Sequence, residues 1–244
     1  MKVIAVIPAR YNSSRFPGKP LASILGKSMI YWVYKSVSEI LEISETYVAT
    51  DDERIFNEVE QFGGRAVMTG ECACGTDRIY EACKDLDFDI VLNIQGDEPM
   101  IRRELVLALL SAFTDENVCM STLKKKIDAE HEINDPNIAK LITDQSGNAI
   151  YFSRSTIPYN RDKNPCVDYY KHIGMYGYRK DFLKQFVQLP RTPLEIAEEL
   201  EQLRAIENGY PIRVVETKFQ SIGVDLPEHI PLVEAHLKKL EGVV

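Results

Sequence analysis

The sequence predicts an α/β fold in which a mainly parallel sheet carries helices on both faces. Three observations predict it: apolar runs alternate with amphipathic segments in the first half, a cation-rich loop follows the first run, and the pattern becomes β-rich after Val118. The chain has 244 residues, 45% of them hydrophobic, which is enough for the core of one domain. No repeat, low-complexity tract or Gly/Ser linker divides it, so we expect a single domain over residues 1–244.

The first half has the βαβα order of a Rossmann-like sheet. Strands are expected at 3–7, 46–50, 65–68 and 89–94, and helices at 29–41, 53–62, 77–86 and 104–113. Because the crossovers between parallel strands are right-handed and ligands bind beyond the carboxyl ends, the loops after Ile7, Thr50, Met68 and Ile94 should converge on one crevice.

The second half, from about 118 to 178, reads as an antiparallel or mixed portion. Strands are expected at 139–143, 149–153, 169–179 and 211–217, with a polar excursion at 160–168 that suits a flap or a dimer arm. One continuous helix is expected from Pro193 to Asn208, ended by Gly209, with Ile196, Leu200, Leu203 and Ile206 on one face. A last helix is expected over 227–240.

The net charge of −8 argues against nucleic acid or an anionic membrane as a partner, because both require basic surfaces. The N-terminus lacks a signal-peptide pattern, and no apolar run is long enough to span a bilayer, so we expect a cytoplasmic protein. Five cysteines form no paired framework, and the Cys72/Cys74 pair lacks the further ligands of a zinc site; free thiols are expected.

The loop after the first strand predicts a triphosphate site. Backbone N–H groups from Pro8 and Ala9 onward would face an anion, and Arg10, Arg15 and Lys19 would neutralise it. The alternative is a basic surface loop whose cations are merely solvated.

Two acids follow apolar runs and are candidates for a metal site. Asp97 in QGDEP and Asp225 in GVDLPE offer the carboxylate oxygens that Mg²⁺ prefers beside phosphate. Either acid can instead be a helix cap, and the sequence does not show whether the two lie close together.

Other polar residues have both a functional and a structural interpretation. Thr76, Arg78 and Gln95 can line a nucleobase, yet an N-cap at Thr76 and a surface cation at Arg78 are slightly favoured. Arg154 suits a carboxylate, but a lone strand-end arginine is more often solvated, and a lone strand histidine such as His172 is more often a core residue. Glu201 and Gln202 are by default a solvated helix face.

Eight segments taken in order resemble the 3-deoxy-manno-octulosonate (Kdo) cytidylyltransferase family, over Val3 to about Glu228. They are IPARYNSSRFPGKPL, ATDDERI, GTDRI, NIQGDEP, YFSRSTIP, HIGMYGYR, PLEIAEELEQLR and GVDLPE. The resemblance implies a nucleotide-sugar transferase fold and a cytosolic homodimer that uses Mg²⁺, CTP and an acidic 3-deoxy-2-keto sugar. It further implies the synthesis of CMP-Kdo and pyrophosphate for lipopolysaccharide, with its β-rich portion in the dimer interface.

The same resemblance assigns roles to residues. Arg10, Lys19, Asp97 and Asp225 would be catalytic, and the two acids would hold the metal. Nucleotide would be bound by Pro8, Ala9, Arg10, Ser13, Arg15, Lys19, Cys74, Thr76, Arg78 and Gln95. Sugar would be bound by Arg154, His172, Tyr176, Glu201 and Gln202.

Cys74 stands where the family pattern has serine, which puts one hydroxyl contact near the cytosine in doubt. Three other activities are alternatives: transfer to a related sugar such as 8-amino-Kdo, transfer to sialic acid, and non-catalytic nucleotide binding. Lys19-Pro20 argues against the sialic acid type, and the two acids argue against a pure binder. A dinucleotide oxidoreductase is excluded because no G-x-G-x-x-G follows the first strand.

Overall fold

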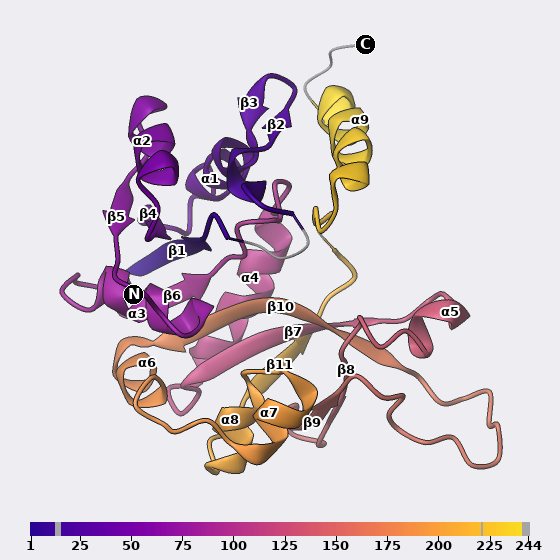
Figure 1. Ribbon diagram of the computed structural model, residues 1–244. Helices are drawn as coiled ribbons and strands as arrows, with labels where there is room; N and C mark the ends of the chain where they lie inside the picture. Colours follow the sequence, from indigo (N-terminus) through magenta and orange to yellow (C-terminus); the bar gives the residue numbers. More distant parts are fainter. Residues whose placement is uncertain (13–15, 221, 241–244) are drawn as a thin grey trace. The chain divides into compact units, whose positions relative to one another are not determined.

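The computed structural model describes residues 1–12, 16–220 and 222–240. Its contacts define two compact units (Figure 1), one from the described parts of Met1–Arg103 and Ser221–Val244 and the other from Glu104–Gln220. None of the helices in these ranges is both long and apolar enough to cross a bilayer. Whether the two units behave as the single domain expected from the sequence stays a prediction.

The first unit contains four parallel strands with helices between them. Its elements are β1 (Val3–Ala9), η1 (Lys19–Leu21), β2 (Ser23–Ile24), β3 (Lys27–Ser28), α1 (Met29–Ser38), β4 (Glu45–Thr50), α2 (Glu53–Gln61), β5 (Ala66–Met68), α3 (Gly75–Cys83), β6 (Ile90–Asn93), η3 (Pro227–His229) and α9 (Ile230–Leu240).

The strands of this unit lie in the order β6-β1-β4-β5. Strand β1 pairs in parallel with both β4 and β6, and β4 pairs in parallel with β5. Right-handed crossovers therefore place α1 and α2 on one face and α3 on the other, as Figure 1 shows. The order reverses between β1 and β6, and such a switch point is where open sheets bind ligands. The parallel strands alternating with helices that the sequence predicts for the first half are confirmed.

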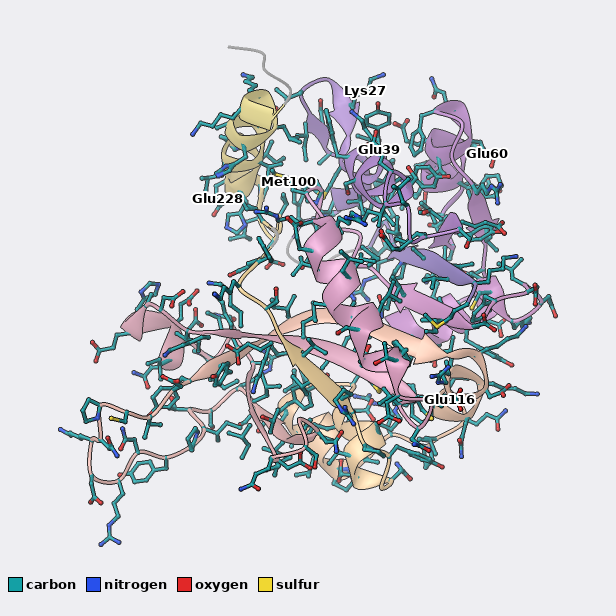
Figure 2. The ribbon with its side chains drawn as sticks, turned by 180° about the vertical axis from the view of Figure 1, so that it is seen from behind. Lys27, Glu39, Glu60, Met100, Glu116 and Glu228 are labelled. Carbon is teal, nitrogen blue, oxygen red and sulfur yellow. The ribbon has the colours of Figure 1, made fainter. Side chains whose placement is uncertain are left out.

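Each helix of this unit buries one apolar side. In α2, Ile55 and Val59 are fully buried, and Asp52 caps the helix by accepting a hydrogen bond from the Arg54 N–H. Charged side chains such as Lys27 and Glu60 are exposed on the outer surface of this unit (Figure 2). Burial of the apolar sides against the strands is what holds the sheet and helices together.

One boundary differs from the prediction. Strand β1 continues through Pro8 and Ala9, which pair with Ala49 and Thr50, so these residues do not lie in an open loop as expected. The reason is that β4 extends to the same level, and the proline has no N–H to offer an anion in any case.

The second unit is the β-rich part predicted after Val118. Its elements are α4 (Arg103–Ser111), η2 (Ala112–Thr114), β7 (Met120–Lys126), α5 (Glu130–Ile133), β8 (Lys140–Thr143), β9 (Ala149–Ser153), β10 (Tyr170–Arg179), α6 (Lys180–Phe186), α7 (Pro193–Glu198), α8 (Leu203–Glu207) and β11 (Arg213–Glu216). Strand β10 runs antiparallel to β7 and β8, β8 runs antiparallel to β9, and β11 runs parallel to β7.

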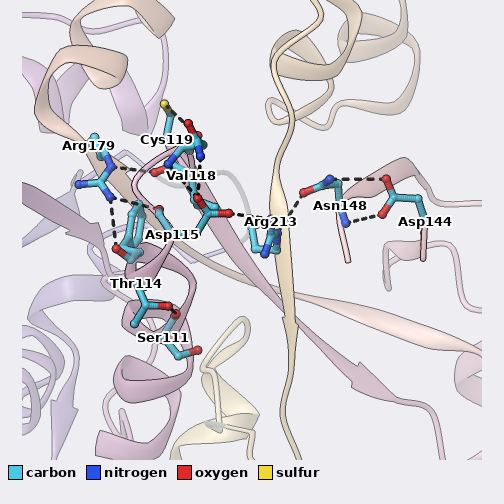
Figure 3. A network of polar contacts seen from close by, with 11 residues as sticks. Ser111, Thr114, Asp115, Val118, Cys119, Asp144, Asn148, Arg179 and Arg213 are labelled. Carbon is cyan, nitrogen blue, oxygen red and sulfur yellow. Dashed lines mark hydrogen bonds and ion pairs between the residues drawn. The ribbon is translucent and has the colours of Figure 1, made fainter. Parts of the chain in front are cut away.

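Two arginines join the strand ends of this unit (Figure 3). Arg213 contacts the Asn148 side chain at 3.1 Å and Asp115 at 3.5 Å, and Asn148 donates in turn to Asp144. Arg179 donates to the carbonyls of Val118, Phe113 and Asp115. These bonds satisfy carbonyls that no strand pairs, and they tie the turn after α4 to β10 and β11.

The continuous helix expected from Pro193 to Asn208 is wrong. The chain forms two short helices, α7 and α8, with Glu199 left-handed between them at φ 51°. A buried ion pair explains the break: Arg204 binds Glu195 at 2.6 and 2.9 Å. In one straight helix these residues would be about 13 Å apart along the axis, so the pair requires the chain to turn back.

Candidate active site

The main chain just before Lys19 is held by a hydrogen bond from the Gly18 N–H to the Tyr11 carbonyl, at 2.9 Å. Gly18 is left-handed at φ 71°, and a Cβ there would lie 3.2 Å from the Tyr11 ring. Glycine is therefore required at this point. Lys19 follows it as the first residue of η1, with its side chain 13% exposed.

Lys19 brings the two predicted metal acids together. Its Nζ lies 2.6 Å from Asp97 Oδ2 and 3.9 Å from Asp225 Oδ1. A backbone hydrogen bond also holds the segments of the two acids together: the Val224 N–H, next to Asp225, donates to the Asp97 carbonyl at 2.8 Å. Neither acid is a helix cap: α4 begins only at Arg103, and the cap of η3 is Leu226. The proximity that the sequence could not show is thus present.

The donor set around Lys19 suits a hard divalent cation. The two carboxylates already accommodate one positive charge between them, the lysine ammonium. In the described part of the chain no group of three or more His, Cys, Asp or Glu side chains gathers as a metal site. Two carboxylates with the remaining ligands left to phosphate and water are typical of Mg²⁺ rather than zinc.

The loop after β6 packs closely against the end of β1 at the switch point. A Cβ on Gly96 would lie 2.9 Å from the Pro8 carbonyl, so only glycine fits between them. Gly75, at the start of α3, also faces Pro8, at 3.8 Å for its Cβ position. Arg10 follows β1 and is exposed. Ser13 and Arg15, also predicted in this site, lie outside the described residues.

The start of α3 differs from the sequence interpretation. Cys74 is the N-cap, its Sγ accepting from the Asp77 N–H at 3.5 Å, whereas Thr76 lies within the helix and is buried. The N-cap interpretation of Thr76 is wrong because the helix begins at Gly75. All five cysteines are free thiols.

Arg78 is buried, so its interpretation as a surface cation is also wrong. It donates to Asp51 at 2.6 Å and to the Thr69 hydroxyl at 2.7 Å. Since these partners follow β4 and β5, Arg78 ties the two loops after these strands together. Gln95, after β6, donates to the Asn93 side chain at 3.1 Å.

Three of the predicted sugar-binding residues meet in the second unit among aromatic rings. His172 Nε2 lies 2.9 Å from the Thr122 hydroxyl, and its ring packs edge-on against Phe152 and tilted against Tyr176. Burial lowers the pKa of His172 to about 3, so the imidazole is neutral at physiological pH. Burial, and then the Glu201 carboxylate, raise the pKa of Tyr176 well above its ordinary value.

Gln202 is the other notable polar group of this unit. It is 3% exposed, and its Nε2 has no hydrogen-bond partner. A buried amide nitrogen without an acceptor is costly, by about 1–3 kcal/mol, and such groups are typical of ligand sites. The solvated-face interpretation of Gln202 is therefore wrong, because the break at Glu199 turns it inward.

Arg154 contacts main-chain carbonyls. Its Nε donates to Glu198 O at 2.7 Å, and its terminal nitrogens donate to Pro136 O at 3.1 Å and Glu199 O at 3.5 Å. Part of the guanidinium remains available, because an arginine has more N–H groups than the carbonyls contacted here.

Comparison with known proteins agrees with this geometry. The cytidylyltransferase family profile matches residues 4–219. A 3-deoxy-manno-octulosonate cytidylyltransferase from Geobacter metallireducens is 47% identical, over 99% of this chain and 100% of the relative. The chain belongs to the 3-deoxy-manno-octulosonate cytidylyltransferase family.

Solved structures extend the comparison. A CMP:2-keto-3-deoxy-manno-octonic acid synthetase complexed with CTP has a TM-score of 0.92 at 42% identity, covering 98% of this chain and 100% of that one. A 4-diphosphocytidyl-2C-methyl-D-erythritol synthase from Anaerococcus prevotii has a TM-score of 0.61 at 17% identity, over 97% and 99% of the two chains. That second likeness shows the fold alone.

For this cytidylyltransferase family member, sequence reasoning missed three polar partners: Asp51, Thr122 and Glu198. Asp51 carried a usable signal, because it directly follows a strand whose end faces the crevice. Thr122 and Glu198 carried none, since their importance lies in contacts with residues about 45 or 50 positions away.

Proposed function

We propose that this chain transfers the cytidylyl group of CTP to Kdo, forming CMP-Kdo and pyrophosphate. The observation that carries the proposal is the meeting of Lys19, Asp97 and Asp225 at the switch point of the sheet. Family membership over nearly the whole chain supplies the substrates.

Asp97 and Asp225 would hold Mg²⁺, and Lys19, which contacts both acids, would be free to contact a phosphate oxygen of the nucleotide. The bound Mg²⁺ would neutralise triphosphate charge and lower the pKa of the attacking hydroxyl. In the absence of substrate, Lys19 occupies the space between the acids and prevents two carboxylates from facing each other uncompensated.

The anomeric hydroxyl of the sugar gives its proton to water and attacks the α-phosphorus in line, and the bond from that phosphorus to the bridging oxygen of pyrophosphate breaks. Lys19 and Arg10 neutralise the departing pyrophosphate. No side chain forms a covalent intermediate, since positioning and charge neutralisation account for the step. Arg78, held by Asp51, keeps the loops beside the cytidine in place together with Cys74, Thr76 and Gln95.

The sugar is bound by the second unit. Its polar groups are of the kind that acidic sugars require: the remaining N–H groups of Arg154 for the carboxylate, and neutral His172, Tyr176 and Gln202 with Glu201 for hydroxyls. A neutral imidazole both donates and accepts, which suits a hydroxyl better than a charged one would.

We further propose that the two units act as one nucleotidyltransferase domain and that the enzyme is a cytoplasmic homodimer. The β-rich portion over 118–178 is the interface, and it exposes Ile150 at 52% and Tyr159 at 86%. Light scattering after size-exclusion chromatography should give twice the 27.8 kDa chain mass. A measured mass equal to that of one chain would contradict the dimer.

The test is pyrophosphate release from CTP and Mg²⁺ with Kdo, 8-amino-Kdo and sialic acid in parallel, and with UTP and ATP replacing CTP. Turnover with CTP and Kdo that exceeds the other pairs by about tenfold or more supports the proposal. Turnover that prefers 8-amino-Kdo would transfer the assignment to that sugar. CTP binding without turnover on any sugar would leave nucleotide binding as the function.

A further inference from the structure

Glu198 makes more polar contacts in the second unit than a surface helix end requires. Its Oε1 accepts from the Ser153 hydroxyl at 2.6 Å and from the Tyr151 hydroxyl at 3.3 Å, and its Oε2 accepts from the Arg154 N–H at 2.8 Å. Burial works against the charge, yet these hydrogen bonds still hold the pKa of Glu198 below its ordinary value. The carboxylate is thus an ionised acceptor surrounded by donors from β9 and from Arg154, the residue that follows it.

The same residue holds Arg154 a second time. The Glu198 carbonyl accepts from Arg154 Nε at 2.7 Å, so one residue fixes both the main chain and the guanidinium of Arg154. Lys140 completes the arrangement from the other side. Its fully buried Nζ donates to the Arg154 carbonyl at 2.6 Å, and also to the carbonyls of Ile138 and Asp135.

Glu198 also stands directly before the turn that orients Glu201 and Gln202. Helix α7 ends at Glu198, and Glu199 is left-handed at φ 51°, an uncommon conformation for a residue with a Cβ. That turn brings the Glu201 charge near Tyr176 and buries Gln202 with its Nε2 unpartnered. A helix end anchored to β9 makes the turn reproducible.

We propose that Glu198 is a positioning residue for the sugar site. It touches no substrate; it fixes Arg154 on one side and the Glu201–Gln202 turn on the other, so that both meet the sugar already ordered. This inference rests on the proposed function. Ordering before binding lowers the entropy lost when the sugar binds, and its effect appears in sugar affinity rather than in nucleotide affinity.

The test compares Glu198→Gln with the neighbouring Glu199→Gln in steady-state assays of pyrophosphate release. Both changes remove one negative charge, but Glu199 is exposed and its side chain has no bond to β9. A glutamine at 198 has one acceptor oxygen where the two carboxylate oxygens accept three bonds, so at least one of the donors Tyr151, Ser153 and Arg154 loses its partner.

For Glu198→Gln we expect KM for Kdo to rise about tenfold, with kcat and KM for CTP within about twofold of wild type. Glu199→Gln should match wild type in all three. A Kdo KM unchanged in Glu198→Gln, or a rise shared equally by CTP, would overturn the positioning role while leaving the proposed function intact. A wild-type chain without turnover of CTP and Kdo would overturn both.

A second variant covers the case in which Glu198→Gln fails to fold. Ser153→Ala deletes one hydroxyl and keeps the charge of Glu198, so we expect about a threefold rise in KM for Kdo alone. No change in that KM would overturn the proposal. Where both variants fold, their double variant should be less impaired than the product of the two single effects, because both break the same bond.

Discussion

The two units use polar groups in opposite ways. In the first, Lys19 lies between Asp97 and Asp225, and the two carboxylates are 32% and 50% exposed. In the second, His172, Tyr176 and Gln202 are shielded among rings and strands, and burial lowers the pKa of His172 to about 3. A charged, solvated site suits a triphosphate with its metal, whereas a shielded, largely uncharged one suits the hydroxyls of a sugar.

The largest expected effect comes from removing a carboxylate in the charged site. Asp97→Asn should lower kcat about a thousandfold, which corresponds to about 4 kcal/mol of activation free energy, because the Mg²⁺ ligand is lost. Asp87→Asn is the matched control in the same unit, since Asp87 is 96% exposed. Steady-state kinetics at saturating CTP measure both, and activity above a tenth of wild type in Asp97→Asn would contradict the metal role.

The next effect is on stability and belongs to the shielded unit. Arg204→Leu leaves the Glu195 carboxylate, 4% exposed, without its main partner, and should lower the free energy of unfolding by about 3 kcal/mol. Lys19→Met, in the site whose carboxylates are partly exposed, should lower the free energy of unfolding by less than about 1 kcal/mol. Urea unfolding measures both. Equal losses of stability would remove the contrast between the units.

The third effect is the pH dependence of His172. Its folded pKa of about 3 lies below the ordinary value near 6.5, so the unfolded chain binds the proton first as the pH falls. The neutral His172 therefore contributes fully to the free energy of unfolding above pH 6.5. As the pH falls from 6.5 toward 3, this free energy decreases by about 1 kcal/mol per pH unit. Wild type should therefore lose stability relative to His172→Gln between pH 6.5 and 5. Ring ¹⁵N shifts that show protonation near pH 6.5 would contradict the shielding.

The smallest effect concerns the cap of α3. Cys74→Ser replaces a weak sulfur acceptor, 3.5 Å from the Asp77 N–H, by a hydroxyl that caps helices well. We expect a gain of about 0.5 kcal/mol in unfolding free energy and a KM for CTP within about twofold of wild type. Thermal melts with kinetics on the same preparation measure both. A KM for CTP that fell tenfold would show that the thiol limits nucleotide binding.

Periodicity predicted the first unit well, because a buried strand and an amphipathic helix are each visible in a local window. The proximity of Asp97 and Asp225 could not be predicted from a local window. It depends on the hydrogen bond from the Val224 N–H to the Asp97 carbonyl, between residues far apart in the chain. For the same reason the helix over 193–208 was mispredicted. Local propensity favours one helix, whereas the buried Glu195–Arg204 pair and the contacts of Glu198 with β9 favour two.

Two glycines and one arginine near the candidate site show what the sequence alone does not reveal. Gly18 and Gly96 stand where a Cβ would meet Tyr11 or Pro8, a constraint that only the structure reveals. The burial of Arg78 was also not predicted. Its sequence context resembles a solvated helix start, and only the position of Asp51 at the end of β4 shows why it is buried.

The most direct measurement is ³¹P NMR of CTP, Kdo and Mg²⁺ with the wild-type chain and with Asp97→Asn. The account predicts that wild type converts the α-phosphorus resonance of CTP into one phosphodiester resonance with an equal amount of pyrophosphate, and that Asp97→Asn leaves the CTP resonances in place. Release of inorganic phosphate, or the same conversion by Asp97→Asn, would contradict it.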